Sequence, residues 1–329
     1  LIKKYLTTFA TQMYYKPISF TPMLYDVSKA VIEKLQDDLF EEKEVTVSIL
    51  RLDKIHPVVS GNKLFKLHYF LQEVLEDQRN ENKFDGTILT FGGAYSNHLA
   101  AIAYACKALQ LKSIGIIRGT WQPYLSATLL QCRADGMELH YISKLQYEFR
   151  NTKENMAFFQ SNFGNCLIIP EGGYDAMGAA GAALIKDLIP KKYSHICTAT
   201  GTATTLAGLL LSATPDQKIV SVPVLKGMID INERLKFLSG KEDISDNLRI
   251  LDGYDFGGYA KKDSSLIDFM NECWLKYNLP LDFVYTAKMM YGVIDSIKNN
   301  YFKEGSHILC LHTGGLQGNK SLPLKSLLF

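Results

Sequence analysis

Lys63 is the strongest candidate for a reactive side chain, because it follows Asn62 at the start of the amphipathic stretch "KLFKLHYFLQEVL". A lysine at this position is normally a solvated surface charge, and it opposes the dipole of a helix that begins there. Inside a cleft, the same positive field and the loss of water would lower its pKa. Lys63 would then be a nucleophilic amine able to form a Schiff base.

The stretch "HICTATGTATTLAGLL" predicts a strand, a turn of small residues and a helix. Backbone N–H groups from Gly201 to Thr205 can converge on an anion at such a turn, and the helix dipole adds favourable charge. The hydroxyl groups of Thr202, Thr204 and Thr205 supply further donors, so the stretch fits a phosphate. The sequence matches neither GxxxxGK[ST] nor GxGxxG, which argues against a P-loop or a dinucleotide site. A plain threonine-rich helix cap is the alternative interpretation.

The stretch "FGGAYSNH" offers a second anion site of the same kind. Gly92 and Gly93 permit a tight turn, and Ser96 can cap the helix that follows. The N–H groups near Ser96, Asn97 and His98 would suit a carboxylate. The alternative is an ordinary capped helix that happens to contain a histidine. An amine, a phosphate site and a carboxylate site together are what a pyridoxal phosphate enzyme acting on amino acids requires.

These residues must be positioned by alternating strands and helices. Unbroken apolar runs indicate buried parallel strands, and helical patterns separate them. Several of the expected strands end in glycine or a hydroxyl residue followed by a helix, and ligands bind where such loops gather. We expect strands at 86–93, 112–119, 137–142, 166–173, 193–200, 217–225 and 306–315, and helices at 96–110, after Pro123, and at 147–160, 176–188, 204–213 and 287–300.

Composition fits an ordinary globular protein of 329 residues, with 47% hydrophobic and 21% charged residues. That length favours two α/β lobes. A net charge of +2 argues against nucleic acid as a partner. The six cysteines show no metal-ligand spacing, so we expect no metal site and a cytoplasmic protein with reduced thiols. No apolar run is long enough to span a membrane.

The first stretch, "LIKKYLTTFATQMYYKPISF", contains three lysines and no acid. This composition weakly resembles a targeting peptide, but it lacks arginine and a cleavage pattern. The alternative is an extension, residues 1–12, that precedes a start near Met13.

Six motifs, in order, resemble the D-cysteine desulfhydrase and 1-aminocyclopropane-1-carboxylate deaminase family of fold type II pyridoxal phosphate enzymes. They span about residues 18 to 318, nearly the whole chain. The motifs are "SGNKLFKL", "FGGAYSNH", "IPEGGYDAMGAAG", "TGTATTLAG", "VYTAKMMYG" and "HTGG". The resemblance implies an α/β fold similar to the tryptophan synthase β subunit, with two open, twisted, mostly parallel sheets flanked by helices. It also implies a homodimer with pyridoxal 5'-phosphate as cofactor.

The resemblance further implies a small domain, residues 66–172, inserted in a larger domain made of residues 1–65 and 173–329. Roles follow by position in the motifs. Lys63 would bind the cofactor as a Schiff base, Asn97 would bond its ring hydroxyl, and Thr313 would face its pyridine nitrogen. Its phosphate would be held by Lys66 and by Gly201, Thr202, Ala203, Thr204 and Thr205. The substrate carboxylate would be received by Ser96, Asn97 and His98, with Tyr285 against the ring.

Two positions separate the subfamilies. The deaminases have Glu where this chain has Thr286, and Leu where it has Thr313, so the sequence is more similar to the desulfhydrases. A neutral residue near the pyridine nitrogen gives a weaker electron sink, which suffices when a thiolate leaves. Tyr95 departs from the Gln common in both subfamilies, and Leu99 from a smaller or polar residue. Tyr95 would either reshape the substrate pocket or pack without effect.

The sequence therefore predicts a carbon-sulfur lyase that performs α,β-elimination on a D-amino acid, most simply D-cysteine. Lys63 or Tyr285 would remove the α-proton, and the catalytic set would be Lys63, Ser96 and Tyr285. The alternatives are 1-aminocyclopropane-1-carboxylate deamination, racemisation or elimination from D-serine derivatives by the same cofactor. A non-catalytic binder of pyridoxal phosphate or amino acids is a further alternative, but it would have no use for an amine between two anion sites.

Overall fold

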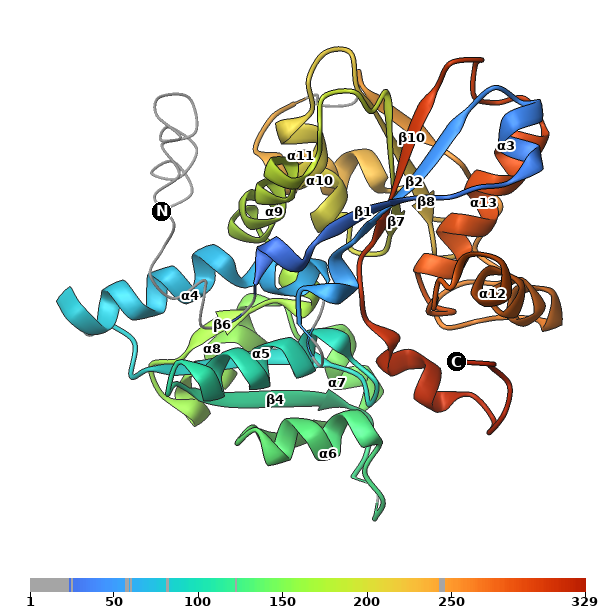
Figure 1. The fold of residues 1–329 in the computed structure, drawn as a ribbon. Helices are drawn as coiled ribbons and strands as arrows, with labels where there is room; N and C mark the ends of the chain where they lie inside the picture. The colour runs from blue at the N-terminus through green and yellow to red at the C-terminus, as the bar shows by residue number, and fades with distance from the viewer. Residues whose placement is uncertain are drawn as a thin grey trace.

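The fold was analysed in a computed structural model of the chain, which describes residues 24, 26–56, 59, 61–80, 83–121, 123–242 and 246–329. Residues 1–12 and Met13, which the sequence suggested as an extension and a start, lie outside the described residues. Element labels follow Figure 1. No helix in these described ranges is long and apolar enough to cross a membrane.

The larger of two sheets has six strands in the order β1-β2-β10-β7-β8-β9. β1 is antiparallel to β2, and every other neighbouring pair is parallel. Strands from the two ends of the chain lie side by side here, since Thr46 pairs with His307. The bounds are β1 (Val31–Lys34), β2 (Thr46–Arg51), β7 (His195–Thr200), β8 (Lys218–Pro223), β9 (Leu248–Ile250) and β10 (His307–His312).

The smaller sheet is entirely parallel and has the order β5-β4-β3-β6. Its strands are β3 (Thr87–Gly92), β4 (Lys112–Arg118), β5 (Glu138–Ile142) and β6 (Leu167–Ile169), all from one continuous part of the chain. Along the sequence, these four strands therefore lie between β2 and β7 of the larger sheet. The arrangement supports an inserted small domain, whose boundaries at residues 66 and 172 stay a prediction.

Helices cover both sheets, and α4 runs between them (Figure 1). One apolar core joins α4, α5, α9 and α10, while a second lies between the larger sheet and α12 and α13. A third packs α7 and α8 against the smaller sheet. The bounds are α3 (Asp38–Glu42), α4 (Asn62–Asn80), α5 (Asn97–Ala108), α6 (Ala127–Ala134), α7 (Lys144–Glu148), α8 (Lys153–Phe163), α9 (Ala176–Ala183), α10 (Thr204–Ser212), α11 (Ile231–Ser239), α12 (Ser264–Tyr277) and α13 (Thr286–Lys298).

Small residues let α9 approach α4 closely. A Cβ atom on Gly181 would lie 2.1 Å from the carbonyl oxygen of Phe65, which is inside van der Waals contact. Ala179 and Ala182 are equally small and lie against Gly208 of α10, so α9 packs closely on two sides. The composition "AMGAAGAA" therefore fixes the position of α4, whose first turns carry Lys63 and Lys66.

All seven expected strands form, and the expected helices largely do. The helix predicted for 147–160 is wrong as one element, because the chain breaks between α7 and α8 and Thr152 caps α8 through the amide of Asn155. The end of the helix predicted for 176–188 tightens into a 3-10 segment, Leu184–Leu188. β1, β2 and β9 were not anticipated.

Candidate active site

All the predicted site residues line one cavity of about 350 Å³. It lies at the carboxyl ends of β3, β7 and β10, where the first turns of α4, α5 and α10 also begin. The structure thus brings together segments more than 200 residues apart in the sequence. The predicted residues on its wall are Lys63, Lys66, Tyr95, Ser96, Asn97, His98, Gly201, Thr202, Ala203, Thr204, Thr205, Tyr285 and Thr313.

Lys63 is enclosed in this cavity, and its pKa is lowered to about 8 by burial, against a smaller opposing effect of the Asp282 charge. Its ammonium donates a hydrogen bond to Oδ1 of Asn62 at 2.6 Å. The amide nitrogen of Asn62 donates in turn to Oγ1 of Thr205, also at 2.6 Å. Asn62 therefore links the amine to the first turn of α10, a role that the sequence did not predict.

The loop before α10 is built to receive an anion. Ala203 has a left-handed backbone conformation, with φ of 65°, which is unfavourable for a residue with a Cβ atom. The first amides of α10 have no carbonyl partner within the helix. Oγ1 of Thr202 lies 2.9 Å from Oγ1 of Thr204, so two hydroxyl groups lie together at the start of α10. Strain at Ala203 is consistent with a functional turn.

Lys66 lies on the same helix as Lys63, one turn further along, and extends to this loop. Its ammonium donates to the carbonyl of Gly172 at 3.0 Å, and a Cβ atom on Gly172 would lie 2.9 Å from the Thr202 side chain. Burial, together with the charge of Lys63, holds the pKa of Lys66 well below its ordinary value. No carboxylate pairs with Lys66 in the described part of the chain, so a bound anion would supply its counter-charge.

The second predicted anion site is the N-terminus of α5. The Ser96 hydroxyl caps it by accepting from the amide of Leu99 at 3.2 Å. The Asn97 side chain donates to the carbonyl of Gly315 at 3.0 Å, while its Oδ1 is buried and has no partner among the residues that the structure places. The two ends of Asn97 therefore differ: one is fixed to the protein, and the other is an acceptor left for a ligand.

His98 borders the cavity, but its ring is anchored behind the wall. Nε2 lies 3.0 Å from Oγ1 of Thr90, whose hydroxyl donates to the carbonyl of Ile169. Because the Thr90 hydroxyl is thereby committed, Nε2–H must be the donor to it. Burial, with the charges of Lys66 and Lys63, lowers the pKa of His98 to about 3. The ring is therefore neutral.

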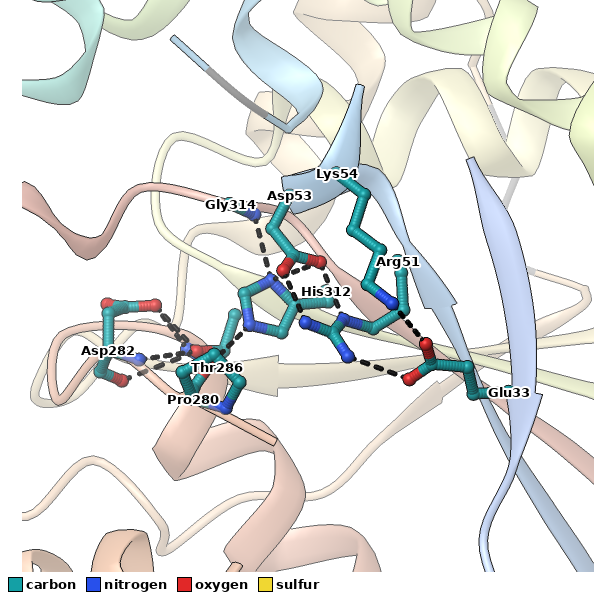
Figure 2. A network of polar contacts seen from close by, with 9 residues as sticks. All are labelled: Glu33, Arg51, Asp53, Lys54, Pro280, Asp282, Thr286, His312 and Gly314. Carbon is teal, nitrogen blue, oxygen red and sulfur yellow. Dashed lines mark hydrogen bonds and ion pairs between the residues drawn. The ribbon is translucent and has the colours of Figure 1, made fainter. Parts of the chain in front are cut away.

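Tyr285 is positioned by a buried carboxylate at the start of α13. Asp282 accepts from the amides of Val284 and Tyr285 with Oδ1. With Oδ2 it accepts from the amide and hydroxyl of Thr286 (Figure 2). Burial, with the Tyr259 hydroxyl and the Asp282 charge, raises the pKa of Tyr285 well above its ordinary value. Its ring lies 5.6 Å from Nζ of Lys63.

Thr313 is positioned by the turn that precedes α4. Gly61 has φ of 83°, and a Cβ atom there would lie 1.7 Å from the carbonyl oxygen of Thr313. The amide of Asn62 donates to that oxygen. Next to Thr313, His312 donates from Nε2 to the carbonyl of Pro280 at 2.6 Å and accepts from the amide of Gly314 (Figure 2).

A chain of charges lies behind His312 (Figure 2). Asp53 is 3.3 Å from Nδ1 of His312 and forms two hydrogen bonds with Arg51, which also contacts Glu33. This network ties β1 and β2 to the end of β10, and so to the Thr313 side of the cavity.

Several cavity residues escaped the sequence prediction: Arg118, Arg150, Glu171, Tyr259 and Arg234. Arg150 is committed to the protein, since it donates to Glu171 and to the carbonyl of Tyr147, both at 2.7 Å. Tyr259 lies 6.1 Å from Tyr285, ring centroid to ring centroid. Arg118 ends β4 and Arg234 lies on α11, and of the five residues only Glu171, in the PEGG segment, belongs to a sequence motif.

Comparisons with known proteins identify what the chain is similar to. No family model matches it. It is 29% identical to a Thermotoga maritima protein named provisionally as a 1-aminocyclopropane-1-carboxylate deaminase, over 85% of this chain and 92% of that protein. It is 28% identical to the bifunctional D-cysteine desulfhydrase/1-aminocyclopropane-1-carboxylate deaminase of Arabidopsis thaliana, over 79% and 70%, respectively.

Solved structures show the same similarity at the level of the fold. The fold matches that of a 1-aminocyclopropane-1-carboxylate deaminase homologue with a TM-score of 0.74 and 27% identity, over 88% of this chain and 90% of the other. A tomato threonine deaminase shares the fold alone, with a TM-score of 0.64 and 15% identity, over 95% and 90%. The resemblance and the α/β fold class expected from the sequence are confirmed.

Proposed function

This chain is a homologue of the 1-aminocyclopropane-1-carboxylate deaminases and D-cysteine desulfhydrases, enzymes that use pyridoxal phosphate, and we propose that it catalyses α,β-elimination on a D-amino acid. With D-cysteine the reaction consumes one water and yields pyruvate, hydrogen sulfide and ammonia. The C–S bond breaks with its electrons on sulfur, the α-proton leaves, and water replaces the amine. Carbon-sulfur lyase activity on D-cysteine is the specific part of this proposal.

The residues of the cavity fit pyridoxal phosphate in three respects. The strained Ala203 turn and the Lys66 amine, which has no carboxylate partner in the described part of the chain, suit its phosphate. The buried, partnerless Oδ1 of Asn97 suits a ring hydroxyl as donor. Lys63 is an amine of lowered pKa between them. When bound, the cofactor supplies an electron-accepting ring that stabilises the negative charge left by loss of the α-proton.

Lys63 is the proposed base. With a pKa of about 8, an appreciable fraction of its amine is neutral near pH 7, whereas an ordinary lysine is almost wholly charged. Tyr285 has a raised pKa and keeps its proton, so it is better suited to donate a hydrogen bond than to remove the α-proton. The choice that the sequence left open between these two residues is therefore resolved in the proposal in favour of Lys63.

The N-terminus of α5 is proposed to hold the substrate carboxylate. The first amides of this helix and the positive end of its dipole favour an anion, and the His98 ring beside them is neutral. Ser96 fixes this end of the helix through the Leu99 amide. In this arrangement the α-carbon is held within reach of Lys63, which keeps the proton transfer short.

Thr286 is the difference from the deaminases that favours elimination over ring opening. The deaminases have a glutamate at this position, and without that carboxylate the pyridine nitrogen would be a weaker electron sink. Thr286 does not line the cavity and has its hydroxyl on Asp282, while Thr313 on the cavity wall is neutral, like the leucine of the deaminases. A good leaving group such as a thiolate tolerates the weaker sink.

Deamination of 1-aminocyclopropane-1-carboxylate is the second candidate, and the names of the relatives support it equally. The same cofactor, base and carboxylate site would serve. The two reactions differ in their product, because ring opening gives a four-carbon keto acid and D-cysteine gives pyruvate and sulfide.

A panel assay of keto-acid release tests the proposal. The purified holoenzyme is supplied with D- and L-cysteine, D-serine derivatives and 1-aminocyclopropane-1-carboxylate, and D-cysteine is expected to give the highest kcat/KM. Lys63→Ala should lower kcat by at least about 10²- to 10⁴-fold, whereas the exposed control Lys153→Ala should not. Ring opening as the dominant activity would reject the D-cysteine assignment, and no turnover of any substrate would reject an enzyme.

A further inference from the structure

Arg118 stands at the mouth of the cavity with no ion-pair partner in the described part of the chain. It is the last residue of β4, next to the end of β3, where Gly92 is in register with Ile117. A Cβ atom on Gly93 would lie 3.9 Å from a terminal nitrogen of its guanidinium. The charge therefore sits over the loop that leads to Ser96 and the N-terminus of α5.

The neighbouring Arg150 shows what a structural arginine looks like here. It is bound by Glu171 and by the Tyr147 carbonyl, and its guanidinium lies 4.3 Å from the Tyr147 ring centroid. The guanidinium of Arg118 lies 5.9 Å from the centroid of the same ring but pairs with no carboxylate among the described residues. A ring contact orients a guanidinium without neutralising it. The side chain of Arg118 is thus held near the cavity and stays available to solvent.

The charges of the cavity leave Arg118 without an assigned role. Five basic residues and one acidic residue line it: Lys63, Lys66, Arg118, Arg150, Arg234 and Glu171. Glu171 pairs with Arg150, and Asp230 pairs with Arg234. The proposed function uses Lys63 and Lys66 for the cofactor and the N-terminus of α5 for the α-carboxylate. One permanent positive charge therefore remains on the substrate side.

We propose that Arg118 binds a second anionic group, carried on the side chain of the substrate. The substrates then include amino acids with a carboxylate, sulfate, sulfonate or phosphate beyond the β-carbon, and a guanidinium suits such planar or tetrahedral oxyanions. This inference rests on the proposed function and adds a substrate class to it. Tyr95 and Tyr259, both exposed at the same mouth, would flank the side chain.

Elimination from such a substrate balances without a further reagent. O-Sulfoserine, for example, plus one water gives pyruvate, ammonia and sulfate. The α-proton leaves, the C–O bond to the β-carbon breaks with its electrons on the sulfate oxygen, and water hydrolyses the remaining C–N bond. Arg118 would contact the group that departs as an anion.

Binding of aspartate and asparagine to the holoenzyme tests the inference, because the two are nearly equal in shape, differ in charge and lack a leaving group. Calorimetric titration with both enantiomers should show that the wild type binds aspartate about 10- to 100-fold more tightly. Arg118→Gln should reduce this ratio to about one, and Arg118→Lys should keep part of it. Arg133→Gln, on the exposed side of α6, is the control of equal charge change and should retain the ratio.

The alternatives give distinct results. Equal affinity of the wild type for the two ligands would overturn the inference, and so would an equal loss for both in Arg118→Gln, which would place the arginine at the α-carboxylate. If Arg133→Gln also lost the preference for aspartate over asparagine, the preference would come from the net charge of the protein and not from Arg118. Turnover separates the two proposals: a retained aspartate preference without elimination from O-sulfoserine, β-chloroalanine or cysteine would reject the lyase and leave the anion site standing.

Discussion

At the scale of single residues, Lys63 is reactive because the fold holds it in an unfavourable state. Its pKa is about 8 against an ordinary 10.5. In the unfolded chain the amine keeps its proton up to about pH 10.5, so folding at pH 7 encloses a charge that water would solvate. At 1.36 kcal/mol per pKa unit, this costs about 3 kcal/mol in the cofactor-free protein. The cost should vanish as pH rises from 8 to 10.5, where the unfolded amine also becomes neutral.

Lys63→Met is therefore expected to stabilise the cofactor-free protein at pH 7. The gain should be about 1 to 3 kcal/mol, since the lost hydrogen bond to Asn62 offsets part of it. Urea unfolding at pH 7, 9 and 10.5 measures it, and the gain should shrink across this range. Lys153→Met, at an exposed position, is the control. A difference between Lys63→Met and wild type that does not change with pH would contradict the enclosed charge.

The sequence predicted site residues that sit in motifs, and missed those that depend on distant packing. Lys63, Asn97 and Thr205 follow Gly-rich turns whose helix N-termini announce an anion site. Arg118 looks like any strand-end charge until the fold places it beside Gly93. Asp282 has no local signal, because its burial depends on α13 folding back over the larger sheet. The functional roles of all these residues stay predictions.

At the scale of elements, the start of α13 explains why Thr286 cannot simply be exchanged for the glutamate of the deaminases. Thr286 is fully buried, with its hydroxyl 2.7 Å from Oδ2 of Asp282. A glutamate there would bring a second carboxylate against the buried Asp282, which forms no ion pair with any residue that the structure describes. Thr286→Glu should lower the free energy of unfolding by about 3 kcal/mol or more.

Thermal and urea unfolding check this expectation. Thr286→Ser is the matched control, because it retains the hydroxyl and should cost far less. A Thr286→Glu variant as stable as the wild type would mean that the N-terminus of α13 has room for a carboxylate near the cavity. The argument that separates this chain from the deaminases would then lose its structural support.

Element prediction succeeded where a short stretch of chain contains its own signal. The apolar runs of β3, β4, β7, β8 and β10 were recognised because both faces of these strands are covered. β2 has the less apolar sequence TVSILR, and it pairs with the short, mostly exposed β1 and with β10, some 260 positions away, so no strongly apolar strand next to it in the sequence suggested a sheet. β9 has three residues with two exposed, which leaves no pattern to detect.

At the scale of the whole molecule, the cavity is assembled from both sheets, so cofactor binding should stabilise segments of each. Hydrogen exchange with and without pyridoxal phosphate is expected to show added protection at residues 93–99, after the smaller sheet, and at 201–206, in the larger one. At 100 times Kd the global gain is about 2.7 kcal/mol. Protection confined to one of these segments would contradict a shared site. The homodimeric state and cytoplasmic location stay predictions.

The most direct test of the central claim is to identify the lysine that carries the cofactor. The protein is incubated with pyridoxal phosphate, reduced with borohydride and digested, and the labelled peptide is sequenced by mass spectrometry. One label is expected, on Lys63, with a visible absorption band that disappears on reduction. A label on Lys66, only three residues away, or no label at all, would contradict the claim.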